Sequence, residues 1–172
     1  MNNWIQNISL ADARKGFHFD PGPNSMLIQI CDPPGDFPTP KFNFKEVHQF
    51  QFLDVEKDDF VLDEAMRCSQ EQANELVRLL QHALDNHMNV IVHCHAGVCR
   101  SGAVCEVGVM MGFRDPEVFR SPNLLVKHRM MKALGWTYDE QEPHTVNGVP
   151  FEYDELNNKI WLHLQNREEN WD

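Results

Sequence analysis

The sequence predicts an α/β fold in which a central, mostly parallel sheet is flanked by helices. Two observations predict it: short apolar runs at 25–32 and 90–92 are bounded by turn residues, and helical patterns lie between and after them. Strands that alternate with helices in this way usually pair in parallel. With 172 residues, of which 42% are hydrophobic, the chain is long enough for one domain with a substantial core.

Three segments are predicted to be strands. Residues 25–32 are apolar and lie between two turns rich in Pro and Gly. Residues 47–55 alternate in polarity before an acidic stretch at 56–59, which is typical of a strand that enters a loop. Residues 90–92, Val-Ile-Val, form a continuous apolar run, as expected for a strand buried on both faces.

Two helices are predicted around the last of these strands. Ser69 and Gln72 form a capping-box pattern ahead of apolar residues at helical spacing, so residues 70–87 should form a long amphipathic helix. Residues 103–111 are apolar almost all round, which is typical of a helix within the core.

A third helix is predicted near the C-terminal end of the main unit. Ser121 is its predicted N-cap, Pro122 its first residue, and Gly135 follows its end. The character then changes, so we divide the chain into a main unit, residues 1–136, and an acidic extension, residues 137–172. The extension should contain a turn and one further helix that packs on the same domain.

The chain is acidic, because 15 Lys and Arg residues stand against 26 Asp and Glu, a net charge of −11. This charge opposes binding to nucleic acid or to an anionic membrane, so we expect neither as a partner. No run approaches eighteen apolar residues and the first residues lack a secretory pattern, so we expect a cytoplasmic protein. The five cysteines are an odd number without a C-x-x-C pair, which favours reduced thiols.

The segment that carries chemistry is residues 94–100, the Cys94–Arg100 loop, between the strand at 90–92 and an apolar helix. A loop at that place directs backbone N–H groups and the positive end of a helix toward a bound dianion such as phosphate. The same field favours the thiolate of Cys94, which makes it a nucleophile at neutral pH. The planar guanidinium of Arg100 can bind two phosphate oxygens, and Ser101 can donate its hydroxyl hydrogen to the departing sulfur.

From His93 to Ser101 the sequence reads H-C-x-x-G-x-x-R-S, which resembles the active-site signature of the cysteine-dependent protein tyrosine and dual-specificity phosphatases. The resemblance extends over the order of elements from 25 to 134, with an acidic loop upstream and the pair Pro122-Asn123 downstream. It implies that residues 1–136 are a phosphatase domain that works through a phosphocysteine intermediate without a metal or other cofactor.

Carried over residue by residue, the resemblance makes Cys94 the nucleophile, Arg100 the phosphate clamp and Ser101 the group that assists thiolate departure. His93 would favour the thiolate by hydrogen bonding, and Asn123, near the start of the third predicted helix, would support the site without contacting the phosphate. The residues expected to surround the phosphate are His95, Ala96, Gly97, Val98, Cys99 and Arg100.

The resemblance also implies an aspartate that protonates the leaving oxygen, and the acidic loop offers Asp54, Asp58 and Asp59. We favour Asp54, because it ends the alternating strand at 47–55, where a rigid element can direct it. Asp58 and Asp59 resemble a solvated loop tip and stay open as alternatives.

A phosphoprotein is the expected substrate, with phosphotyrosine first and phosphoserine and phosphothreonine as further candidates. Positions 95–99 contain no lysine, unlike loops that bind polyphosphorylated lipids. Two other functions stay open. One is a catalytically silent phosphopeptide-binding module of the same fold, and the other is a thiol-redox enzyme of the arsenate-reductase type, which the pair Cys94 and Cys99 suggests.

Overall fold

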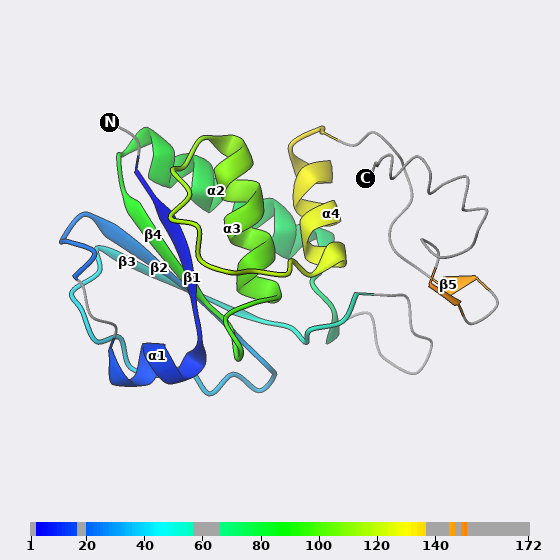
Figure 1. Ribbon diagram of the computed structural model, residues 1–172, viewed down its shortest axis with the longest axis horizontal. Coiled ribbons are helices and arrows are strands. Elements are labelled where there is room, and N and C mark those ends of the chain that lie inside the picture. The colour runs from blue at the N-terminus through cyan, green and yellow to red at the C-terminus, as the bar shows by residue number, and fades with distance from the viewer. Residues whose placement is uncertain (1–2, 17–19, 57–65, 137–144, 147–148, 151–172) are drawn as a thin grey trace.

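The computed structural model describes residues 3–16, 20–56, 66–136, 145–146 and 149–150. Figure 1 shows the strands and helices of these ranges. The strands are β1 Ile5–Ile8, β2 Ser25–Cys31, β3 Glu46–Gln51, β4 Asn89–His93, β5 Thr145–Val146 and β6 Val149–Pro150. The helices are α1 Leu10–Lys15, α2 Gln70–Asp85, α3 Arg100–Met111 and α4 Leu124–Ala133.

The central sheet has four strands in the order β1-β4-β2-β3, and every pair is parallel. The predicted α/β fold is therefore confirmed. Val90 of β4 lies opposite Ile5 of β1 on one side and opposite Met26 of β2 on the other. Because parallel strands end at the same edge of a sheet, the segments that follow β4, β2 and β3 meet at one place.

Apolar side chains cover both faces of the sheet. On one face, Ile28 and Val92 belong to the larger cluster, which α2, α3 and α4 complete. On the other face, Leu27 and Ile91 pack with Ala13 of α1. Figure 1 shows α1 on the side of the sheet away from α2, α3 and α4. The continuous apolar run of β4 is thus buried on both faces, as predicted.

The sequence does not predict β1 or α1, which are only four and six residues long. Ile5 and Ile8 are buried on opposite faces of the sheet, and the polar residues between them obscure the pattern. Helix α1 begins directly after β1, where the Ser9 side chain accepts a hydrogen bond from the Asp12 N–H. Both elements depend on tertiary packing more than on local sequence.

The two helices predicted around β4 are present, with shifted ends. The capping box of Ser69 and Gln72 is formed in both directions, which confirms the predicted start of α2. Helix α2 ends at Asp85, two residues earlier than predicted, and His87 then adopts a left-handed φ of 57°. Helix α3 begins at Arg100, three residues earlier than predicted, so the end of the Cys94–Arg100 loop is already its first turn.

The predicted N-cap of α4 is wrong. Asn123, and not Ser121, caps this helix: its side chain accepts from the Val126 N–H at 3.0 Å. The Ser121 N–H donates instead to the Val98 carbonyl oxygen at 3.1 Å, so Ser121 is part of a segment that lies against the Cys94–Arg100 loop. The predicted end is confirmed, because Gly135 follows α4 with a φ of 74°.

The alternation of polarity predicts a strand that ends at residue 55. In the structure, β3 ends earlier, at Gln51. After it, Phe52 turns its side chain fully into the core, and the Leu53 N–H donates to the Met66 carbonyl oxygen at 2.8 Å. The Phe52 N–H still donates to the Cys31 carbonyl oxygen of β2 at 3.2 Å, and the chain leaves the sheet after it. Asp54 therefore lies on a loop, three residues beyond the strand that was expected to direct it.

Little of the acidic extension belongs to the described residues. Strands β5 and β6 pair antiparallel on either side of positions 147 and 148. The expected further helix lies outside the described residues, and the division at 136 stays a prediction. Among the helices that the structure describes, none is long and apolar enough to cross a membrane.

Gly97 fixes how closely the Cys94–Arg100 loop approaches β1. Its φ is 76°, and a Cβ atom at this position would lie within 2.4 to 2.6 Å of backbone atoms of Ile8 and Ser9. Backbone atoms cannot move aside as a flexible side chain would. Only glycine therefore fits both the conformation and the space at this position.

We predict that Gly97→Ala lowers the free energy of unfolding by about 3 kcal/mol or more, because the left-handed φ and the steric overlap both oppose a side chain. Gly135→Ala is a matched control, because its φ of 74° is nearly equal and, apart from its chain neighbours, no described residue has an atom within 4 Å of its Cβ position. It should lose only about 1 to 2 kcal/mol. Urea denaturation measures both, and equal losses would show that the close approach is unimportant.

Candidate active site

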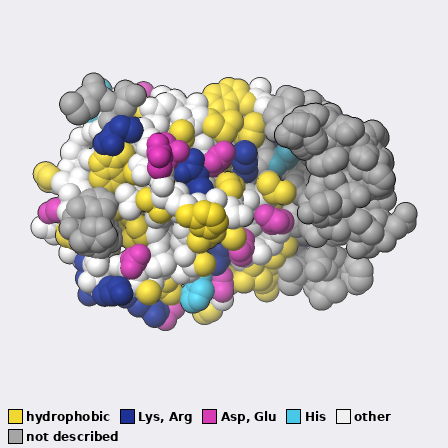
Figure 2. Space-filling view, in the orientation of Figure 1, with side chains coloured by type: hydrophobic (Ala, Val, Ile, Leu, Met, Phe, Trp, Pro, Cys, Tyr) yellow, Lys and Arg dark blue, Asp and Glu magenta, His cyan; other side chains and the backbone are white. Residues whose placement is uncertain are grey.

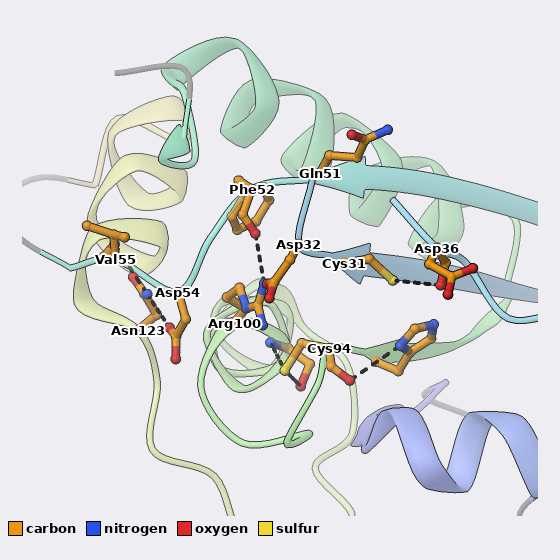
Figure 3. Close-up of polar contacts among 12 residues, drawn as sticks. Cys31, Asp32, Asp36, Gln51, Phe52, Asp54, Val55, Cys94, Arg100 and Asn123 are labelled. Carbon is orange, nitrogen blue, oxygen red and sulfur yellow. Dashed lines mark hydrogen bonds and ion pairs between the residues drawn. The ribbon is translucent and has the colours of Figure 1, made fainter. Parts of the chain in front are cut away.

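Three strand ends bring the candidate residues together (Figure 3). Cys94 follows β4 directly, and Asp32 follows β2 directly. Asp54 lies on the loop after β3. Helix α3 then begins at Arg100, so the Cys94–Arg100 loop lies between the end of a buried strand and the positive end of a helix.

The Cys94–Arg100 loop is held from outside through its carbonyl oxygens. Four of these oxygens accept hydrogen bonds from residues that do not belong to the loop, on β1, on α1 and in the segment before α4. The pairs are Leu10 N to His95 O (3.0 Å), Asn7 Nδ2 to Gly97 O (2.7 Å), Ser121 N to Val98 O (3.1 Å) and Asn123 N to Cys99 O (2.9 Å).

These outward carbonyl groups determine where the N–H groups of the loop point. In a planar trans peptide the N–H is directed opposite to the carbonyl, so the N–H groups that follow the four anchored carbonyls turn toward the inside of the loop. Among the described residues, none accepts a backbone hydrogen bond from positions 95–99. The loop thus presents a group of free donors, which is the arrangement that binds an oxyanion.

The sulfur of Cys94 lies at the base of this loop and is buried, with 2% of the residue exposed. Its Sγ is 3.1 Å from the Ser101 Oγ, and it accepts from the Ser101 N–H at 3.4 Å. Both contacts come from the first turn of α3, so the helix directs its donors at the sulfur. Hydrogen bonds of this kind stabilise a thiolate.

His93 is fully buried beside Cys94. Burial lowers the pKa of its imidazole, and the nearby Arg100 lowers it further. Its Nδ1 lies 3.4 Å from the Cys94 carbonyl oxygen, so the polar contact is with the backbone of Cys94 and not with the sulfur that the sequence led us to expect. Its Nε2 is buried without a partner among the described residues.

Arg100 is almost fully buried, and one nitrogen of its side chain makes all the polar contacts that it has with the described residues. Its Nη1 donates to the Asp32 carboxylate at 2.6 Å and to the Phe52 carbonyl oxygen at 2.7 Å, as Figure 3 shows. The Nε–H is buried and has no partner among the described residues. The contact with Asp32 is not predicted from the sequence. A general rule could have indicated it: parallel strands end at the same edge of a sheet, so the residue after β2 lies near the loop after β4.

Asp54 is exposed and is held through Asn123. The fully buried Asn123 donates from Nδ2 to the Asp54 carboxylate at 2.6 Å and lies 3.4 Å from the Val55 carbonyl oxygen (Figure 3). The Glu56 carboxylate accepts from the Leu124 N–H at 2.9 Å, which fastens the same loop to the start of α4. The structure thus brings Asp54 and Asn123 into one group.

Other parts of the site differ in how well sequence reasoning identified them. Asp58 and Asp59, the alternatives to Asp54, lie outside the described residues. Sequence reasoning missed Glu56 and Asn7, although Asn7 is buried in β1 and holds Gly97. A polar residue inside a four-residue strand carries no sequence signal of this role.

Burial disfavours the thiolate form of each of the four other cysteines. Burial raises the pKa of Cys99, and the nearby Asp54 raises it further. Burial also raises the pKa of Cys68 to about 12 and raises that of Cys105. These groups stay protonated near neutral pH. In the described part of the chain, no group of three or more His, Cys, Asp or Glu side chains is placed to hold a metal ion.

Comparison with known proteins agrees with this geometry. Residues 50–110 match a family described as "Polymorphic toxin system, DSP-PTPase phosphatase". No curated protein matches the chain. The matched segment runs from the end of β3 to α3 and contains Asp54 and the whole Cys94–Arg100 loop. Over these residues the chain is similar to dual-specificity-type phosphatases, which supports phosphatase activity and confirms the resemblance seen in the sequence.

Proposed function

We propose that the protein hydrolyses phosphate monoesters of phosphoproteins through a phosphocysteine intermediate. The observation that carries the proposal is that the Cys94 sulfur accepts a hydrogen bond from the Ser101 N–H at the base of the Cys94–Arg100 loop. The N–H groups at positions 95–99 of this loop have no acceptor among the described residues. A phosphoryl group bound by these donors has its phosphorus above the sulfur. Arg100 then supplies the positive charge that the phosphate oxygens require.

In the first step the Cys94 thiolate attacks phosphorus and forms the S–P bond, while the ester P–O bond breaks. Asp54 transfers its proton to the leaving oxygen. In the second step water attacks phosphorus, the Asp54 carboxylate takes the proton of that water, and the S–P bond breaks. The Ser101 hydroxyl, 3.1 Å from the sulfur, stabilises the thiolate as it departs.

Phosphotyrosine is the proposed substrate group, with phosphoserine and phosphothreonine as further ones. The loop contributes no lysine for additional phosphates. On the described part of the face in Figure 2, basic side chains are interspersed with acidic ones, which does not favour a polyanionic partner. A cytoplasmic location, and the lack of nucleic-acid and membrane partners, likewise remain proposals.

We predict that Cys94→Ser abolishes phosphate release from p-nitrophenyl phosphate, because serine is a far weaker nucleophile than a thiolate. Binding of tungstate, measured by calorimetry, should persist, because the oxyanion site is made of N–H groups and Arg100. Cys68→Ser is the control for loss of a buried thiol, because the contacts of Cys68 are with Ser69 and Arg129 and not with the Cys94–Arg100 loop.

Substantial turnover by Cys94→Ser would contradict the nucleophile assignment. A wild-type protein that binds phosphopeptides without releasing phosphate would be the silent binding module instead. An arsenate-reduction assay run in parallel tests the thiol-redox alternative, which requires Cys99 as well as Cys94.

We predict that Asp54→Asn lowers kcat for phenyl phosphate by about 10²-fold or more, the usual contribution of a general acid. An ester with an acidic leaving group should lose much less, because its oxygen departs without a proton. Steady-state rates with both substrates measure the difference. If Asp58→Asn or Asp59→Asn shows this pattern and Asp54→Asn does not, the acid is one of those residues.

A further inference from the structure

We infer that Asn7 is a positioning residue that links two parts of the site: the Cys94–Arg100 loop, which binds the oxyanion, and residues 119–123, which position the general acid. These last residues, the 119–123 segment, lie directly before α4. The inference deepens the proposed function and rests on it for the catalytic readout. Anion binding and amide exchange test it without turnover.

Asn7 is a polar residue at a position where the neighbouring side chains are apolar. It lies opposite Val92 of β4 and two residues after Ile5, on the same face of the sheet, and both of these belong to the larger apolar cluster. Only 2% of Asn7 is exposed. A buried amide is unfavourable unless its donors are used, so this position indicates a specific role and not packing alone.

Both hydrogens of the Asn7 amide nitrogen are used. Nδ2 donates to the Gly97 carbonyl oxygen at 2.7 Å and to the Phe119 carbonyl oxygen at 3.0 Å. An amide nitrogen carries two hydrogens, so the two contacts match its capacity. Because both neighbours are acceptors, neither a carboxylate nor an apolar side chain can make these bonds in its place.

The bond to Gly97 fixes one donor of the oxyanion site. With the Gly97 carbonyl held outward, the planar peptide turns the Val98 N–H toward the inside of the loop. This N–H has no acceptor among the described residues. Glycine permits many backbone conformations, so the peptide between Gly97 and Val98 depends on the Asn7 bond for its orientation.

The bond to Phe119 attaches the 119–123 segment to the same amide. Two further contacts follow along this segment, each between one of its N–H groups and a carbonyl oxygen of the Cys94–Arg100 loop. They are Ser121 N to Val98 O (3.1 Å) and Asn123 N to Cys99 O (2.9 Å). The link through Asn7 precedes both, and it is the one that ties the loop and the segment to the sheet.

The 119–123 segment ends at the residue that holds the general acid. Asn123 donates from Nδ2 to the Asp54 carboxylate at 2.6 Å, as Figure 3 shows. If the segment shifts relative to the loop, Asp54 shifts relative to the phosphoryl group that the loop binds. A displacement of about 1 Å is enough to lower the rate of a positioned reaction. We therefore expect loss of the Asn7 amide to weaken both oxyanion binding and proton donation.

Asn89 provides a matched control. It lies at the start of β4, five residues before Cys94, and its Nδ2 donates to the Pro21 carbonyl oxygen at 3.3 Å. Asn89→Asp removes an amide and adds a charge, as Asn7→Asp does. Asn7→Leu removes the donors without a charge and with little change in size. The three variants together separate the lost hydrogen bonds from added charge and from a general loss of stability.

The test measures tungstate affinity by calorimetry and amide hydrogen exchange of Ser121 and Asn123 by NMR, after circular dichroism has shown that each variant is folded. We expect Asn7→Leu and Asn7→Asp to weaken tungstate binding about tenfold or more, because one oxyanion donor loses its orientation. Exchange of both amides should become about tenfold faster, because the segment opens more readily. Asn89→Asp should stay within about twofold of wild type in both measurements.

The rates with phenyl phosphate and p-nitrophenyl phosphate test the link to Asp54. Asn7→Leu should lower kcat about threefold more for phenyl phosphate than for p-nitrophenyl phosphate, because only phenyl phosphate requires the acid. This difference between the two substrates should disappear in the Asp54→Asn background.

Four results would each overturn the inference. They are unchanged tungstate affinity in both Asn7 variants, unchanged amide exchange, equal losses in Asn89→Asp, and a difference between the two substrates that is absent or that persists without Asp54. Because tungstate binding and amide exchange need no turnover, a wild-type protein without phosphatase activity would contradict the proposed function alone.

Discussion

The outward anchoring of the Cys94–Arg100 loop is the constraint on which the rest of the site depends. Its carbonyl oxygens are bound by β1, by α1 and by the segment before α4, so the planar peptides must turn their N–H groups inward. The side chain of Asn7 and the close approach of Gly97 to Ile8 bring β1 into this arrangement. The Cys94–Arg100 loop is therefore shaped partly by β1, which lies about 90 residues earlier in the sequence.

Positive charge is then concentrated at one end of α3. The first turn of this helix contains no acidic residue, and Arg100 stands at its first position. The Ser101 N–H adds a donor directed at the Cys94 sulfur. The carboxylate that balances Arg100 comes from Asp32, directly after β2, and not from α3 itself.

The segment after β3 connects the two sides of the site. In this segment the Phe52 carbonyl oxygen accepts a hydrogen bond from the Arg100 guanidinium. Two residues later, the Asp54 carboxylate accepts one from the Asn123 side-chain amide. Asn123 also caps α4 and donates its backbone N–H to the Cys99 carbonyl oxygen. One buried asparagine therefore joins the helix start, the Cys94–Arg100 loop and the exposed carboxylate. A side chain with both a donor and an acceptor is needed for this.

The sequence by itself determined the α/β class, the strand at 90–92 and the capped helix after Ser69, and it indicated Cys94, Arg100 and Ser101 as candidate site residues. Each of these depends on local periodicity or on a motif of fixed spacing, which a chain carries in its own order. Only the tertiary structure decided that β1 pairs beside β4, that Asn123 and not Ser121 caps α4, and that Asp32 binds Arg100. These features join residues far apart in the chain, and a contact between distant segments is set by packing, which no local pattern encodes.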